Sequence, residues 1–144
     1  MELKVKILRP GAQLPARATQ GSAGYDLCLC AQEALLLPPG EIRSAPTGIA
    51  IELPEGTVGL VFGRSGLGIK HGIAPANAVG VIDSDYRGEL LVGLINHSAD
   101  AYTIRPGERM AQLVILPVLT PEIVPVQTLS ESARAQGGFG STGK

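Results

Sequence analysis

The 144-residue sequence contains no tryptophan, two cysteines and five aromatic residues, and no long hydrophobic run. A membrane span needs about 18 consecutive apolar residues, and none of that length is present. The segment 1–7 alternates apolar and charged residues, so it lacks the apolar core of a signal peptide. We therefore expect a cytoplasmic protein that does not bind a membrane.

Neither sign of charge dominates, because 12 Lys and Arg residues face 13 Asp and Glu residues, for a net charge of −1. A nucleic-acid footprint needs clustered Lys and Arg, so we expect no nucleic-acid partner. Any phosphate that the protein binds must belong to a small ligand. Cys28 and Cys30 would share one face of a strand without good disulfide geometry, which indicates two thiols in a reducing compartment. His71 and His97 are isolated, and no Cys/His spacing suggests zinc.

The abundant residues are turn formers, with 19 Gly and 11 Pro separating short apolar runs. About ten short strands at this spacing predict an all-β sandwich or jelly roll. We expect two of the turns to be hairpin turns, one joining 47–53 to 57–62 and one joining 79–82 to 89–96. The expected strands are 3–8, 25–30, 35–37, 47–53, 57–62, 79–82, 89–96, 102–104, 110–118 and 124–129.

Only the segment 65–72 resembles a helix, with Ser65 able to cap its start and Gly72 able to end it. Beyond residue 129 the sequence becomes rich in Gly, Ser and Gln and cannot form a core of its own. We therefore predict one domain, 1–129, followed by a flexible C-terminal arm, 130–144.

The segment 80–89 is the strongest candidate for chemistry. Asp83 follows an apolar run, and a carboxylate beside an apolar wall can act as a general base toward water. Asx residues also simply initiate turns, which locally is an equally good interpretation. Two aspartates and an exposed Tyr86 exceed the needs of one tight turn, and this favours a function. Asp85 is better explained as a turn former.

The segment 62–68 leads from a strand into the short helix through Arg64, Ser65 and Gly66. Free backbone N–H groups at a helix start favour an anion, and the serine and arginine add a donor and a charge. The alternative is an ordinary capped turn. Gln112 presents a second open choice, since an amide inside an apolar strand needs a partner that is either protein or ligand.

The tail 138–144 matches the letters of a phosphate-binding loop, but the sequence ends where that motif needs a Ser or Thr and a helix. A Walker-type ATPase is therefore excluded in practice. The glycine amides, Arg134 and Lys144 could still wrap phosphates as a flap, and Phe139 could stack on a nucleobase. The alternative is a disordered terminus whose Phe139 contacts a neighbouring subunit.

Together these segments resemble the trimeric dUTPase family (deoxyuridine 5′-triphosphate nucleotidohydrolases) over nearly the whole sequence and in all five family motifs, in order. The matching segments are Ala23–Leu27, Gly63–Leu67, Gly80–Glu89, Arg109–Leu113 and Arg134–Gly143.

The resemblance implies a distorted jelly roll or β-barrel with one very short helix and a mobile C-terminal arm. It implies a homotrimer with shared active sites, in which the arm completes a neighbour's site. The expected reaction is hydrolysis of dUTP to dUMP and pyrophosphate, which keeps uracil out of DNA and supplies dUMP for thymidylate synthesis. Mg²⁺ would be bound mainly through the substrate triphosphate.

The resemblance also assigns roles to residues. Asp83 would be the catalytic base, and Asp26 would contact Mg²⁺ through water. The substrate contacts would be Arg64, Ser65, Gly66 and Gln112 at the phosphates, Asn77, Val81, Ile82 and Leu91 around uracil, Tyr86 at the deoxyribose, Arg134 at the γ-phosphate and Phe139 stacked on uracil.

Two positions depart from the family pattern. Gly63 replaces the usual proline, and Ala135 replaces a glycine after the tail arginine, where alanine would be strained if φ must be positive. The nearest rival is the related dCTP deaminase, alone or bifunctional, which would release ammonia from dCTP. The other rival is a non-catalytic nucleotide sensor, which would bind dUTP without producing pyrophosphate. The turn 83–86 favours dUTPase.

Overall fold

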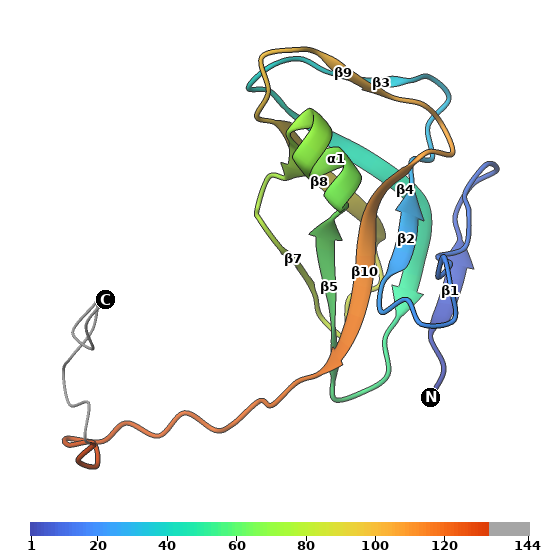
Figure 1. Cartoon of the computed structure of the whole chain (residues 1–144). Coiled ribbons are helices and arrows are strands. Elements are labelled where there is room, and N and C mark those ends of the chain that lie inside the picture. Colours follow the sequence, from blue (N-terminus) through green and yellow to red (C-terminus); the bar gives the residue numbers. More distant parts are fainter. Residues whose placement is uncertain (133–144) are drawn as a thin grey trace.

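The structure, a computed structural model, describes residues 1–132 and is built from short strands with a single short helix, α1 (Ser65–His71), in that part of the chain. Figure 1 shows their arrangement. The strands are β1 (Lys4–Ile7), β2 (Tyr25–Cys28), β3 (Leu35–Leu37), β4 (Ile42–Glu52), β5 (Thr57–Gly63), β6 (Ile73–Pro75), β7 (Gly80–Ile82), β8 (Glu89–Asn96), β9 (Tyr102–Ile104) and β10 (Arg109–Pro117).

The strands form two four-stranded sheets and a two-stranded one. The first sheet has the order β1-β4-β8-β6, the second β2-β10-β5-β7, and β3 pairs with β9. All the pairings are antiparallel. The expected all-β jelly-roll class is confirmed. The barrel alternative is wrong, because within residues 1–132 the two sheets keep separate edge strands and do not close.

Both expected hairpins are wrong as paired units. β4 and β5 are consecutive in sequence but belong to different sheets, and so do β7 and β8. In a two-sheet fold, a turn between apolar runs can carry the chain across the core instead of folding it back on its neighbour. The segment 83–88 is therefore a crossing between sheets, and its conformation depends on both of them.

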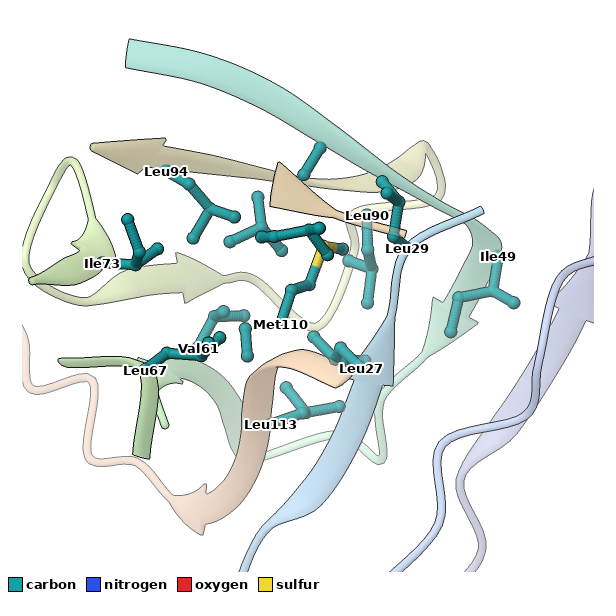
Figure 2. Close-up of a cluster of buried hydrophobic side chains, with 14 of the residues drawn as sticks. Leu27, Leu29, Ile49, Val61, Leu67, Ile73, Leu90, Leu94, Met110 and Leu113 are labelled. Atoms are coloured by element: carbon teal, nitrogen blue, oxygen red, sulfur yellow. The ribbon is translucent and has the colours of Figure 1, made fainter. Parts of the chain in front are cut away.

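The core lies between the two four-stranded sheets and consists of their inward-facing aliphatic side chains (Figure 2). Leu27, Leu113 and Val61 come from the second sheet, while Leu90 and Leu94 come from the first. Leu67 anchors α1 to this core and is the buried residue of that helix. This anchoring fixes the place where β5 ends and the phosphate-site candidates begin.

The ends of α1 were half correctly predicted. Gly72 ends the helix in the left-handed conformation at φ 67°, as expected. Ser65 does not cap its start: the capping position is Arg64, whose backbone is extended, and no side chain caps the helix. The Ser65 hydroxyl is therefore not consumed by the helix end.

After β10 the chain runs away from the sheets through 118–132 without a helix or strand (Figure 1). The short strand expected at 124–129 is wrong, because no partner strand lies beside this segment among residues 1–132. Its apolar side chains, including Leu119 and Ile123, are exposed. No helix in the described residues is long and apolar enough to cross a membrane.

Candidate functional site

The structure gathers the predicted site residues of residues 1–132 into two separate groups. One pocket of about 510 Å³ is lined by Asp26, Arg64, Ser65, Gly66 and Gln112 together with residues of 18–24 and Val114. A second cavity of about 150 Å³ is lined by Val81, Ile82, Asp83, Tyr86, Glu89, Leu90 and Leu91. Arg134 and Phe139 lie outside the described residues.

The first pocket, called here the arginine pocket, is formed where β2, β10 and the end of β5 meet. Its Asp26 sits on β2 opposite Gln112 of β10, and Gln112 is in turn opposite Phe62 of β5. Segments that are distant in sequence therefore become neighbours across one sheet. The pocket lining is mainly polar side chains and backbone, which suits a charged ligand.

Asp26 organises the charges of this pocket. Arg64 Nε donates to Asp26 Oδ1 at 3.1 Å, and Arg109 Nη1 donates to Asp26 Oδ2 at 3.1 Å. The two guanidinium groups outweigh the single carboxylate, so the group keeps a net positive charge that favours an anion. Arg64 is also tied to the Arg109 carbonyl at 3.4 Å, which limits its freedom further.

Arg109 is a residue to which sequence reasoning gave no role, although it belongs to the segment Arg109–Leu113. The signal that could have found it was its position at the start of a strand expected to carry Gln112. What the sequence could not give is the register that brings Arg109 opposite Cys28, two residues from Asp26.

Gln112 resolves its open choice toward both interpretations. Its Nε2 donates to the Gly63 carbonyl at 2.9 Å, so the amide has a protein partner, and the side chain also lines the arginine pocket. Gly24 leaves room for it: a Cβ added there would lie 2.7 Å from Gln112 Oε1. Gly63, which replaces the usual proline, supplies the carbonyl that orients the amide.

Ser65 and Gly66 form the start of α1 and lie exposed at the mouth of the same pocket. The first N–H groups of a helix have no intrahelical partner, so they are available to an acceptor from outside. With an uncapped serine hydroxyl beside them, this corner presents donors and no acidic side chain in its first turn.

The second cavity, called here the crossing cavity, forms where the chain passes between the sheets. β7 is less buried than the sequence suggested: Val81 is 62% exposed, and Asp83 is exposed as well. The expectation of a carboxylate at the end of a buried strand is wrong within the single chain, because β7 is an edge strand with no neighbour on its outer side.

Tyr86 is held over the turn by short-range contacts. Its N–H donates to the Asp83 carbonyl at 3.1 Å, and its hydroxyl donates to the Glu89 carbonyl at 3.0 Å. A Cβ on Gly88 would lie 2.4 Å from the Tyr86 hydroxyl oxygen, so only glycine leaves space for the ring. The ring is 43% exposed and faces the cavity with Asp83.

Asn77 lies in the turn before β7, and its side-chain nitrogen would be 3.8 Å from a Cβ on Gly80. The next residue, Ala78, has φ 63°, a left-handed conformation that is uncommon for a side chain with a Cβ. This turn sets the entry of β7. Asn77 is not among the residues that line the crossing cavity.

The two pockets lie at opposite ends of β5. Ile82 pairs with Gly59 in antiparallel register, so Asp83 follows toward Val58, whereas Arg64 follows the other end of β5. At about 3.3 Å per residue, Asp83 and Arg64 are on the order of 20 Å apart. One chain therefore cannot place Asp83 and Arg64 at the same phosphate group.

Among residues 1–132, no group of three or more His, Cys, Asp or Glu side chains could hold a metal ion. Asp26 is the single acidic side chain that lines the arginine pocket, and both its oxygens already accept hydrogen bonds from arginines. This arrangement does not fit a direct metal ligand. It fits contact with the water shell of an ion that is held by phosphate oxygens.

The comparisons with known proteins agree on one family. The dUTPase family model matches residues 11–143. A deoxyuridine 5′-triphosphate nucleotidohydrolase of Paraburkholderia phytofirmans is 51% identical over 147 residues, covering 100% of this chain and 99% of its own. One of Desulfitobacterium hafniense is 52% identical over 132 residues, covering 91% of this chain and 87% of its own.

Solved structures are similar as well. The dUTPase of Staphylococcus bacteriophage 80alpha with dUPNHPP has a TM-score of 0.91 at 34% identity, covering 99% of each chain. A mutant dUTPase from phage phi11 of S. aureus, which coordinates a structural Mg(II) ion, has a TM-score of 0.80 at 30% identity, covering 89% of this chain and 98% of its own.

Proposed function

Since this chain belongs to the dUTPase family and hydrolyses dUTP, we propose that Asp83 is the general base of that reaction. Asp83 accepts a proton from a water molecule, the water oxygen bonds to the α-phosphorus, and the bond from that phosphorus to the bridging oxygen breaks. The products are dUMP and pyrophosphate. The observation that carries this proposal is the crossing cavity, where Asp83 shares a wall with Tyr86 and the end of β7.

The base and sugar are read in the same cavity. The exposed edge of β7 offers the unpaired backbone groups of Val81 and Ile82 to the uracil, with Leu91 beside them. A pocket of fixed donors and acceptors can reject a base with the wrong pattern by up to about 10⁴–10⁵-fold. Asn77 borders the entry of β7, and the Tyr86 ring packs on the deoxyribose and leaves no room for a 2′-hydroxyl.

The phosphates are held by the arginine pocket. Arg64, Ser65, Gly66 and Gln112 contact them, and the net positive charge around Asp26 offsets part of their charge. Mg²⁺ enters with the triphosphate and neutralises phosphate charge, with Asp26 touching its water ligands. The arm 130–144 closes over the nucleotide, with Arg134 at the γ-phosphate and Phe139 on the uracil.

Each complete site is shared between subunits of a homotrimer. The support from the structure is the separation on the order of 20 Å between Asp83 and Arg64, which antiparallel pairing imposes along β5. Joining the crossing cavity of one subunit to the arginine pocket of another brings the two groups to one nucleotide. Exposed Val81 and Leu91, at 62% and 58%, lie at the cavity where such a contact would form. By removing dUTP and producing dUMP in the cytoplasm, the enzyme would keep uracil out of DNA and feed thymidylate synthesis.

The deciding experiment is Asp83→Asn in a product assay with dUTP, dTTP, dCTP and UTP in parallel. We expect the wild type to release pyrophosphate from dUTP alone, and the variant to bind dUTP but release none. Turnover of dUTP by Asp83→Asn at the wild-type rate would reject the base assignment. Deletion of 131–144 serves as the companion: activity should fall far more than stability, and an undiminished rate would remove the arm from the mechanism.

A further inference from the structure

Glu89 is the residue at which the crossing segment re-enters the first sheet, and its side chain is engaged on both sides. Its Oε1 accepts the Gly48 N–H at 2.8 Å, and its carboxylate pairs with the guanidinium of Arg9. Its main-chain carbonyl accepts the Tyr86 hydroxyl at 3.0 Å. One residue thus joins the nucleotide cavity, the strand β4 and the segment after β1.

The backbone at Gly48 explains why such a tie is needed. The pairing of β4 with β8 slips between Pro46 and Ala50, so Gly48 has no strand partner in this ladder. Its N–H is taken by Glu89, and its carbonyl accepts the Leu8 N–H at 2.8 Å. The φ of 70° at Gly48 turns these groups outward. The bulge therefore works as a fixed socket for the Glu89 carboxylate.

The charge balance of this socket is local. The Glu89 side chain is 19% exposed, so it is partly desolvated, and Arg9 is the cation that it contacts. A partly buried carboxylate depends on such a partner more than a surface pair does. Loss of Arg9 would leave the Glu89 carboxylate held by the Gly48 N–H alone, and would free it to turn toward water.

We propose that Glu89 and Arg9 are positioning residues for substrate selection: the Arg9–Glu89–Gly48 network fixes the carbonyl that holds Tyr86, and thereby sets the room left for a 2′-hydroxyl. Neither side chain needs to touch the nucleotide. This inference rests on the proposed role of Tyr86 at the sugar, and it extends the determinants of specificity to the segment after β1.

The test compares Glu89→Gln and Arg9→Met with the wild type. Glu89→Gln keeps an oxygen that accepts the Gly48 N–H but loses the charge that binds Arg9. Arg9→Met keeps most of the aliphatic stem. The matched control is Arg43→Met, which removes the Arg43–Glu41 ion pair on the same sheet, far from the crossing cavity in sequence and outside its lining.

Two readouts are measured on the full-length enzyme. The first is the ratio of kcat/KM for dUTP to that for UTP, which we expect to fall about tenfold in both variants, below the ~100-fold that a 1 Å misplacement can cost. The second is hydrogen exchange of the amides in 84–89, which should lose protection. Arg9→Lys should restore both readouts, and Arg43→Met should change neither.

The outcomes separate this proposal from the one on which it rests. Tyr86→Ala reports the role of the tyrosine directly: an unchanged dUTP preference there would reject the sugar-reading role and, with it, the selectivity arm of this proposal. A lowered preference in Tyr86→Ala with unchanged preference in Glu89→Gln and Arg9→Met would overturn the positioning role alone. Unchanged exchange protection in 84–89 would overturn it too, whatever the nucleotide kinetics.

Discussion

The substitution Gly24→Ala tests how the arginine pocket is assembled. An alanine Cβ at this position would lie 2.7 Å from Oε1 and 3.3 Å from Cβ of Gln112. The backbone φ of Gly24 is not positive, so alanine itself is compatible with the local conformation. The cost must therefore come from the Gln112 side chain, which has to leave its position and its 2.9 Å bond to the Gly63 carbonyl.

The magnitude follows from two costs and one gain. Losing a half-buried amide hydrogen bond costs about 1 kcal/mol, and an off-rotamer side chain costs about 0.5–1.5 kcal/mol. Replacing glycine by alanine returns about 0.4–1 kcal/mol through the unfolded state. We expect Gly24→Ala to lower the free energy of unfolding by about 1 kcal/mol in the wild-type background. The KM for dUTP should rise, because Gln112 leaves the pocket.

A double-mutant cycle with Gln112→Ala isolates the cause. Once Gln112 is truncated, the obstruction is gone, and Gly24→Ala should become neutral or stabilising by up to about 1 kcal/mol, a coupling of about 2 kcal/mol. The assay is urea unfolding at one fixed protein concentration. Gly21→Ala is the control, since a Cβ there meets nothing within 4 Å and its φ is not positive. Equal effects of Gly24→Ala in both backgrounds would refute the reasoning.

Two further predictions concern strain and ionisation. Ala78→Gly should raise the free energy of unfolding by about 0.5–1 kcal/mol, because relief of the left-handed alanine at φ 63° exceeds the added unfolded-state entropy; urea unfolding measures this, and a less stable variant would contradict it. Burial of the Cys28 thiol, and then the charge of Asp26, raise its pKa above the ordinary value against the opposing effects of Arg109 and Arg64. The folded state therefore favours the neutral thiol, a contribution fully present below the unfolded pKa and lost as the pH rises through the folded pKa. Cys28→Ala should show a smaller stability loss than the wild type between about pH 8.5 and 10.5, and parallel pH profiles of the two proteins would argue against it.

The comparison of prediction and structure differs between local and long-range features. Turn residues and apolar runs correctly located most strands and the end of α1 at Gly72, because these depend on short-range sterics. The hairpins at 47–62 and 79–96 were wrong, because a turn signal says where the chain reverses and not which strand it pairs with next. The strand expected at 124–129 was wrong for the same reason: β propensity needs a neighbouring edge to pair with.

The sequence alone determined which residues could do the chemistry. The types and order of Asp26, Arg64, Ser65, Asp83 and Gln112 were sufficient to name the family, because each residue type suits one step of phosphate hydrolysis. Register and burial could not be read from the same pattern, since both depend on strands far apart in sequence.

Only the tertiary structure decided how these residues are grouped. It set Arg109 beside Asp26, left Ser65 uncapped, and exposed Asp83 on an edge strand. Above all, antiparallel pairing along β5 put Asp83 and Arg64 at opposite ends of one strand. The physical reason is that a strand fixes the distance between its ends, whereas the linear order of motifs carries no distance at all.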